Sequence, residues 1–191
     1  MKDKNALIVG IRDEESICHA IAGEIKRAGY NIYATYQDET TYPGVRRVAE
    51  AMGIRKLFPY DARRDEDLEA FTTAVKQEGI ALDLLVHGIS YSTAEGAKLD
   101  LPLTAVSWEE FTDAIRVGAF SLVEISGRLL DVFKDEASIL AVSLRWSKVA
   151  VPRFNVVGAT KAALESIIRG LAQSLGRAKK IRVNGISPGF V

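Results

Sequence analysis

Short apolar runs alternate with amphipathic stretches along the whole chain. The clearest runs, residues 6–10 and 82–89, are apolar without alternation, as expected of strands that are buried on both faces. Apolar residues at helical spacing fill the stretches between the runs and predict helices. Strands are therefore expected at residues 6–10, 31–35, 56–60, 82–89, 138–143 and 181–186, and helices at residues 43–52, 65–77, 107–133 and 155–175, with one more that ends at Gly29.

The alternation of strands and helices predicts the fold class. It favours βαβ units and a mostly parallel sheet, which right-handed crossovers wind into an α/β doubly wound Rossmann fold with helices on both faces and strand order 3-2-1-4-5-6. A length of 191 residues without repeats predicts one dinucleotide-binding domain over residues 1–191. Because ligands of such sheets bind at the carboxyl ends of the strands, the polar and glycine residues that follow the strands should converge at one edge.

The charge balance and the cysteine count exclude several classes of partner. Lys and Arg number 25, as do Asp and Glu, so there is no basic excess to bind nucleic acid. The N-terminal apolar run is too short for a signal or membrane segment, and the single cysteine, Cys18, fits a reducing compartment. Two histidines, His19 and His87, and one cysteine at unrelated spacings predict no metal site. We expect a cytoplasmic protein in which His87 is a core residue.

Two features that follow the first strands leave alternatives open. Gly10 allows a tight turn, and a helix that starts near Ser16 would direct free N–H groups at a pyrophosphate. The full three-glycine fingerprint is missing, however, and Ser16 could instead only cap the helix. Asp38, after the second strand, could accept hydrogen bonds from an adenosine ribose or could be an ordinary loop acid.

Phe154 and Lys161 stand seven residues apart at the start of the last predicted helix. Seven steps of about 100° return to within roughly 20° of the start, so both side chains are expected on one helix face. This spacing is also part of a wider set of motifs. The set comprises Gly10, Ser16 and Ile17; residues 35–37; Asp61 and Ala62; residues 86–89; residues 151–158 with Lys161; and residues 182–189.

In this combination the chain resembles the short-chain dehydrogenase/reductase superfamily, and specifically its branch of enoyl-acyl-carrier-protein reductases. The resemblance covers essentially the whole chain and implies an NAD(P)H-dependent reductase of enoyl thioesters in fatty acid synthesis. It implies Ser143, Phe154 and Lys161 as the catalytic positions. It places cofactor contacts at Gly10, Ile11, Ser16, Ile17, Gln37, Asp61, Ala62, Gly88, Ile89, Lys161, Pro188, Gly189 and Val191.

Cofactor and partners follow from the same resemblance. NADH is expected because no arginine or lysine stands directly beside Asp38 to bind a 2′-phosphate, while Arg46 and Arg47 keep NADPH possible. The substrate is expected to be an acyl thioester on a small molecule or on a carrier protein. The helix over residues 155–175 is apolar around most of its circumference, and with the helix over residues 107–133 it predicts a homotetramer.

The chain departs from the family pattern in three places. Phe154 replaces a tyrosine that handles the proton, and Leu144 replaces a second aromatic hydroxyl. Family members also continue beyond the position of Val191, so a lid and a last strand are expected to be missing from the chain as given. The alternative to a reductase is therefore a catalytically impaired nucleotide-binding paralogue that serves as a sensor or as an assembly subunit. Substitute proton donors are Lys161, Ser143, Ser90, Tyr91 or a ribose hydroxyl through water.

Overall fold

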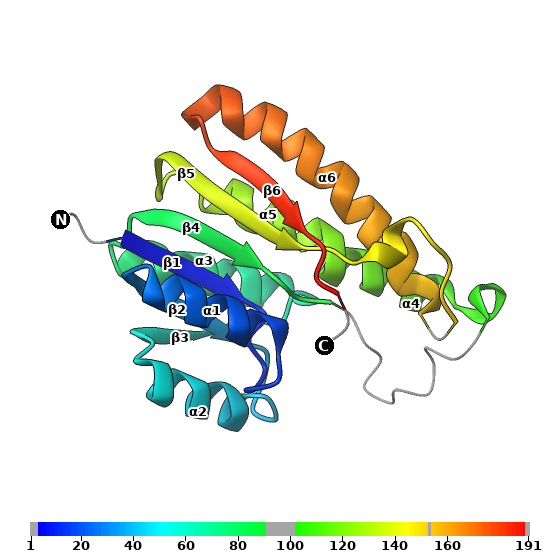
Figure 1. Ribbon diagram of the computed structural model, residues 1–191, viewed down its shortest axis with the longest axis horizontal. Helices are drawn as coiled ribbons and strands as arrows, with labels where there is room; N and C mark the ends of the chain where they lie inside the picture. The colour runs from blue at the N-terminus through cyan, green and yellow to red at the C-terminus, as the bar shows by residue number, and fades with distance from the viewer. Residues whose placement is uncertain (1–3, 91–101, 153, 190–191) are drawn as a thin grey trace.

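The computed structural model of the protein describes residues 4–90, 102–152 and 154–189. Within them, a parallel sheet runs in the order β3-β2-β1-β4-β5-β6, as predicted (Figure 1). The strands are β1 (Lys4–Val9), β2 (Tyr30–Tyr36), β3 (Lys56–Pro59), β4 (Leu82–His87), β5 (Phe133–Val142) and β6 (Arg182–Ile186). The chain therefore reverses its direction of winding between β1 and β4, which is the switch point where doubly wound sheets bind ligands.

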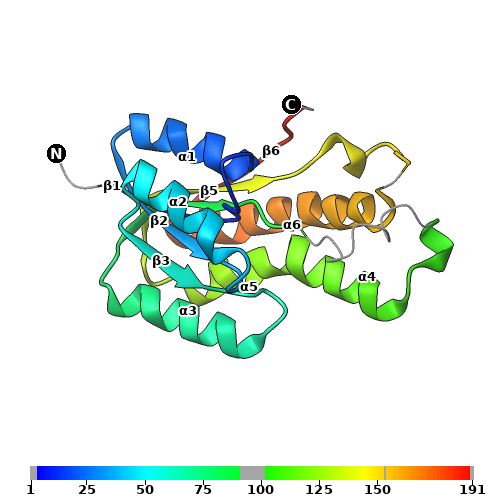
Figure 2. The same cartoon turned by 90° about the horizontal axis from the view of Figure 1, so that it is seen from below.

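Helices cover both faces of the sheet (Figure 2). One apolar cluster packs α1 and α2 against the sheet, and a second packs α3, α5 and α6 against the opposite face. The helical elements are α1 (Ile17–Arg27), α2 (Tyr42–Met52), α3 (Asp65–Gln77), η2 (Leu103–Ala105), α4 (Trp108–Ile115), η3 (Arg116–Phe120), α5 (Ser121–Arg128), η4 (Arg145–Ser147) and α6 (Asn155–Lys179). Because β1 lies between the two clusters, its residues Ala6 to Val9 are fully buried, as the unbroken apolar run predicted.

The expected helix over residues 107–133 is only partly confirmed. Ser107 begins it with a complete capping box, in which its hydroxyl and backbone exchange hydrogen bonds with Glu110. The helix then continues through the π-helical turn η3 into α5, which ends at Arg128. The predicted end was wrong because Phe133, at 2% exposure, is needed in the sheet, where it pairs with Leu82.

The π-helical turn brings Gly118 directly against α6. An ideal Cβ on Gly118 would lie 2.5 Å from Cγ2 of Thr160, which is 1% exposed. Thr160 is held there by the hydrogen bond that its hydroxyl donates to the Val156 carbonyl, at 3.0 Å. This contact fixes the distance between η3 and the helix that carries Lys161.

A methyl group added to Gly118 should therefore destabilise the fold. We expect Gly118→Ala to lower the free energy of unfolding by about 1–3 kcal/mol, since Thr160 has no room to move away. Thr160→Ser, which removes Cγ2 and keeps the hydroxyl, should recover most of that loss in the double variant. Gly127→Ala on α5 is the matched control, because nothing lies within 4 Å of its Cβ position. Urea unfolding of all four proteins measures the effect, and additive losses in the double variant would contradict it.

Candidate active site

The carboxyl ends of β1 and β4 approach each other more closely than side chains would allow. Gly10 has φ of 124°, and a Cβ placed on it would lie 2.6 Å from the carbonyl carbon of Gly88. A Cβ on Gly88 would in turn lie 2.1 Å from Sγ of Cys18, which is buried on α1. The two glycines therefore let the ends of β1 and β4 and the helix α1 pack directly against one another at the switch point of the sheet.

The first turn of α1 lies against Gly88 through Cys18. Ser16 is the N-cap residue, but its hydroxyl donates to the Asp13 carbonyl at 2.8 Å and caps no helical N–H group. The interpretation of Ser16 as a simple helix cap is thus wrong. Among the described residues no side chain caps the first turn, which also holds no acid. The His19 N–H donates to the Ser16 carbonyl at 2.9 Å, so the N–H groups of Ile17 and Cys18 and the helix dipole remain for an anion. Ile11 is buried beside the turn, whereas Ile17 is 37% exposed.

Asp61 and Gln37 meet at the ends of β2 and β3, as the predicted cofactor site requires. Gln37 Nε2 donates to Asp61 at 3.4 Å, and Arg63 Nε donates to the same carboxylate at 3.0 Å. Burial of Asp61 raises its pKa, but hydrogen bonds and charge from Arg63 outweigh this and hold the pKa below its ordinary value. The ionised, 8% exposed carboxylate next to buried Ala62 can accept from an adenine amino group. Sequence reasoning missed Arg63.

Asp38 serves its own loop. One carboxylate oxygen accepts from the Thr40 hydroxyl at 2.6 Å and from the backbone N–H groups of Thr40 and Thr41 at 3.0 Å each. These bonds, the Thr40 hydroxyl first, lower the pKa of Asp38. The geometry favours the loop-acid interpretation that the sequence had left open.

Lys161 is buried at the strand ends, with 2% of its surface exposed. Its ammonium group donates to the carbonyl of Val142 at 3.0 Å and to that of Ile89 at 3.4 Å, which ties α6 to β5 and to the end of β4. Burial lowers the pKa of Lys161 from 10.5 to about 8, although the nearby Cys18 opposes the shift. The lysine therefore remains a cation at neutral pH, with a third N–H group still to donate.

Ser143 is engaged by a residue that sequence reasoning did not single out. Its hydroxyl donates to Glu165 Oε1 at 2.8 Å, and the Ser147 hydroxyl donates to the same oxygen at 2.6 Å. These bonds, Ser147 first, lower the pKa of Glu165 despite its partial burial. Glu165 lies four residues after Lys161, a spacing of one helical turn that could have drawn attention to it.

Phe154 lies just before the helix that carries Lys161. It is the N-cap residue of α6, with φ of −133° and ψ of 44°, so helical spacing does not apply to it. Its ring stacks on Trp146, with the ring centroids 3.7 Å apart and the planes at 29°. Helical periodicity therefore does not fix the direction of the Phe154 ring, because the helix begins one residue later and Trp146 provides an aromatic partner outside it.

His87 is a buried, neutral core residue. Its Nε2 lies 2.8 Å from the Ser121 hydroxyl, which itself donates to the Val117 carbonyl, so Nε2 carries the proton. Burial, and then the charge of Lys161, lower the pKa of His87 to about 3. Its Nδ1 has no partner among the described residues. The expectation of a core role agrees with this burial.

The remaining predicted residues lie at the same edge or outside the described part of the chain. The Ser143 N–H donates to the Ile186 carbonyl at 2.8 Å, so β6 ends beside Ser143, and Pro188 and Gly189 follow that strand end in the chain. Ser90 is exposed at the end of β4. Val191 and Tyr91 lie outside the described residues.

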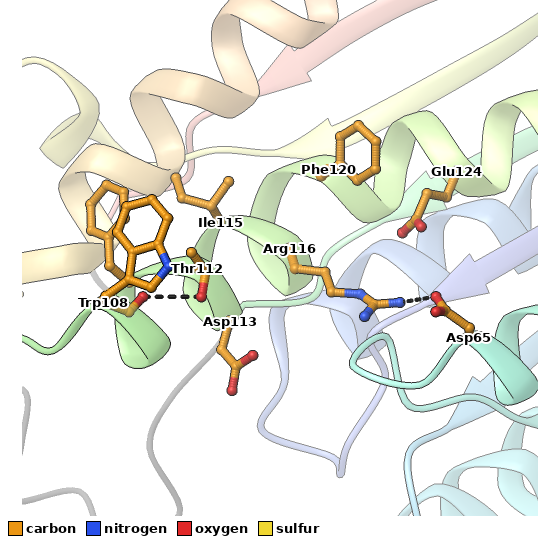
Figure 3. A pocket seen from close by; sticks show the side chains of 9 residues that line it. Asp65, Trp108, Thr112, Asp113, Ile115, Arg116, Phe120 and Glu124 are labelled. Carbon is orange, nitrogen blue, oxygen red and sulfur yellow. Dashed lines mark hydrogen bonds and ion pairs between the residues drawn. The ribbon is translucent and has the colours of Figure 1, made fainter.

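A separate pocket of about 590 Å³ lies between α4, η3 and the start of α3 (Figure 3). Arg116 extends from its floor to an ion pair with Asp65, and Trp108 lines its other end at 79% exposure. Phe120, also on its rim, is 48% exposed. The pocket is distinct from the site at the strand ends, where Lys161 of α6 is buried.

Two searches of the described residues are negative. They contain no group of three or more His, Cys, Asp or Glu side chains that could hold a metal ion. No helix in this part of the chain is long and apolar enough to cross a membrane.

Comparison with known proteins decides the family. A family model described as Enoyl-(Acyl carrier protein) reductase matches residues 10–191. The chain belongs to this enoyl reductase family. It is 32% identical over 189 residues to the enoyl-[acyl-carrier-protein] reductase [NADH] FabI of Nostoc sp., covering 97% of this chain and 72% of the relative. The FabI of Aquifex aeolicus is 32% identical over 192 residues, covering 100% of this chain and 70% of the relative.

Solved structures of the family share the fold. The reductase from Anaplasma phagocytophilum in complex with NAD superposes with a TM-score of 0.91 at 30% identity, covering 100% of this chain and 72% of that one. The Aquifex aeolicus reductase superposes with a TM-score of 0.91 at 31% identity, covering 98% of this chain and 73% of that one. The α/β Rossmann fold and the enoyl reductase branch that the sequence predicted are therefore confirmed.

The burial of Lys161 should be visible in the pH dependence of stability. Its pKa is lower in the folded state, about 8 against 10.5, so between these values the unfolded chain binds more protons at this group. This group should therefore raise the free energy of unfolding with pH in that window, by up to about 1.4 kcal/mol per pH unit. Lys161→Met should lack this rise. Chemical unfolding from pH 7 to pH 11 measures it, and parallel curves for both proteins would contradict the account.

Proposed function

We propose that this enzyme reduces the double bond of an enoyl thioester with NADH, on a small molecule or on a carrier protein. The observation that carries the proposal is the buried Lys161 ammonium group, which is hydrogen-bonded to carbonyl groups at the ends of β4 and β5, beside the close approach of Gly10 and Gly88. In the balanced reaction an enoyl thioester, NADH and a proton give the saturated thioester and NAD⁺. Residues 1–191 act in it as one dinucleotide-binding domain, and its setting is the cytoplasm.

The residues at the strand ends fit a dinucleotide. The N-terminus of α1, which the Ser16 side chain does not cap, suits the pyrophosphate, and Gly10 and Gly88 let this helix lie directly against the ends of β1 and β4. Asp61 and Gln37 suit the adenine half, and Lys161 suits the nicotinamide ribose. NADH would supply the hydride for the β-carbon of the double bond. Ile11, Ser16, Ile17, Ala62, Ile89, Pro188, Gly189 and Val191 complete the proposed set of cofactor contacts.

NADH is favoured over NADPH by the residues around Asp38. Asp38 and Glu39 are both exposed acids that would repel a 2′-phosphate. The two arginines that kept NADPH open are paired elsewhere, Arg46 with Glu50 at 2.8 Å and Arg47 with Glu14 at 3.2 Å. The Nostoc and Aquifex relatives are named as NADH-dependent, whereas a Bacillus cereus relative was solved with NADP⁺.

The proposed reaction also requires a source for the proton. Phe154 has no hydroxyl group. The Ser143 hydroxyl donates its hydrogen bond to Glu165, so towards a substrate it presents lone pairs and not a donor. The cationic Lys161 retains one unused N–H group, which can orient a ribose hydroxyl and stabilise negative charge on the thioester oxygen. These observations support Lys161, acting directly or through the ribose, as the source of electrostatic stabilisation.

The same observations support a second candidate. With no hydroxyl at Phe154 or at Leu144, and with Ser143 bonded to a carboxylate, the chain could bind nucleotide without turning over. It would then serve as a sensor or as a subunit of an assembly. Reductase activity of the variant Phe154→Tyr distinguishes the two functions.

We expect Phe154→Tyr to raise kcat for an enoyl thioester. The ring is only half buried, so a hydroxyl adds no overpacking. The new donor should recover part of the factor of about 10²–10⁴ that a positioned acid contributes. Oxidation of NADH by crotonyl-coenzyme A measures the rate, with Lys161→Ala as the control that should lose cofactor affinity.

Two outcomes would revise this view. If the wild type already has a high kcat and Phe154→Tyr does not raise it, another group delivers the proton. If NADH binds to the wild type by calorimetry but neither it nor Phe154→Tyr turns over, the sensor function is the correct one.

We further propose a homotetramer in which the pocket beside Trp108 is covered by a second copy of the chain. Trp108 at the start of α4 and Phe120 at the end of η3 expose large aromatic surface, and both line this pocket. Leu122 on α5 and Leu129 at its C-cap are buried in the core instead. Light scattering at micromolar concentration should give the mass of four chains. The double variant Trp108→Ser, Phe120→Ser should dissociate, and a monomeric wild type would contradict the proposal.

A further inference from the structure

Asp61, at the end of β3, is held by an arginine two residues after it. The Arg63 backbone N–H donates to Oδ1 of Asp61 at 2.9 Å, and Nε of the same arginine donates to Oδ1 at 3.0 Å. Nη2 of Arg63 donates to the other oxygen, Oδ2, so the planar guanidinium group contacts both oxygens of the carboxylate. A short turn therefore folds Arg63 back onto Asp61 and fixes the plane of its carboxylate.

The same carboxylate retains little capacity to accept further hydrogen bonds. A carboxylate oxygen accepts about two hydrogen bonds, and Oδ1 of Asp61 already accepts two from Arg63. Oδ2 accepts from Nη2 of Arg63 and, at 3.4 Å, from Nε2 of Gln37. The bond from Gln37 is the longest of the set, and Gln37 is itself exposed just after β2. One acceptor position on Oδ2, held only by this long bond, can therefore pass to a donor from a ligand.

Burial makes this acceptor position selective. The side chain of Asp61 is only 11% exposed, so little water can replace a donor that is lost or mismatched there. Burial by itself raises the pKa of Asp61, but the bonds and the charge of Arg63 outweigh it and hold the pKa below its ordinary value. The carboxylate is thus ionised and can only accept hydrogen bonds.

We propose that Arg63 is a positioning residue for the cofactor, which clamps Asp61 so that one lone pair of Oδ2 is directed at the amino group of adenine. The amino group takes the place of the Gln37 amide, so the exchange costs the protein only one long hydrogen bond. The inference rests on the proposed use of NADH and names Arg63 as the residue that makes the site selective for the base. The family resemblance assigned Asp61 and Ala62 to this end of the site, but not Arg63.

A dinucleotide with hypoxanthine in place of adenine provides the first test. Reduced nicotinamide hypoxanthine dinucleotide differs from NADH only in the base, which has a carbonyl oxygen in place of the amino group. A clamped carboxylate then faces a second acceptor, whereas a carboxylate that can turn is able to accept from the N1–H group of hypoxanthine. We expect the wild type to bind NADH at least about tenfold more tightly than the analogue, and Arg63→Ala to reduce this ratio to within about threefold. Fluorescence of the reduced nicotinamide measures both Kd values without turnover.

Two further variants separate the clamp from its charge. Arg63→Lys keeps the positive charge but replaces the planar fork by a single ammonium group, so its ratio should stay close to that of Arg63→Ala. Arg64→Ala is the matched control, because Arg64 is the adjacent arginine, is exposed, and also pairs with an acid, Asp67, at 3.5 Å. It should keep the ratio of the wild type. Full selectivity in Arg63→Lys, or an equal loss in Arg64→Ala, would show that net charge decides and would contradict the clamp.

The exchange with Gln37 has a test of its own. Because Gln37 only yields its place to adenine, Gln37→Ala should keep the selectivity ratio and leave the Kd for NADH within about threefold of the wild type. If Gln37→Ala loses the selectivity while Arg63→Ala retains it, the amide of Gln37 reads the base and the role assigned to Arg63 is wrong.

The outcome for Arg63 is separable from the outcome for the reductase function. Selective binding of NADH by the wild type that is lost in Arg63→Ala supports the clamp, even if no enoyl thioester is reduced. Turnover with NADH in a protein whose Arg63→Ala variant keeps the full ratio refutes the clamp and leaves the reductase in place. A wild type that binds both dinucleotides equally also refutes the clamp. If the wild type binds neither dinucleotide at millimolar concentration, the clamp and the proposed use of NADH are both refuted.

Discussion

The burial of one ammonium group governs the arrangement of this site. Lys161 is almost fully enclosed, and a buried cation is stable only if its N–H groups find acceptors. The acceptors are the carbonyl groups of Val142 and Ile89, which end two neighbouring strands. To meet them, α6 must lie close to the sheet, and the close contact of Gly118 with Thr160 is one consequence. The positive charge is thereby placed at the switch point of the sheet, where a dinucleotide binds in this fold.

Two of the residues that the sequence predicted to be catalytic are engaged by neighbouring side chains. Ser143 is bonded to Glu165 and not directed at a substrate, and Phe154 is stacked on Trp146 outside the helix. Both contacts involve the turn η4: Ser143 shares its acceptor with Ser147 of this turn, and Phe154 stacks on Trp146 of the same turn. The two residues therefore belong to one structural unit. One end of the site has the N-terminus of α1 and the two glycines, and the other end has the stacked rings of Trp146 and Phe154.

Sequence reasoning succeeded where a residue's role depends on local pattern. The apolar runs and the alternation of strands and helices gave the strand order, and Gly10, Asp61 and Lys161 lie at the predicted edge. It failed where tertiary contacts decide. Residues 129–133 fit a helical period, yet Phe133 pairs with Leu82 in the sheet. Phe154 has the spacing from Lys161 that suits one helix face, but it lies just before the helix. Nothing local could reveal that Glu165 binds two serines, since the three residues meet only when α6 packs on β5.

The central claim is that this site transfers hydride from NADH to an enoyl thioester although Phe154 lacks the usual hydroxyl. The most direct measurement uses NADH that carries deuterium at both C4 positions, with dodecenoyl-coenzyme A and the wild-type protein. Mass spectrometry and NMR of the product should find one deuterium, on the β-carbon of the saturated thioester, with one NADH oxidised per product formed. A product without that deuterium, or NADH that binds and is not oxidised when the thioester is present, would contradict the account.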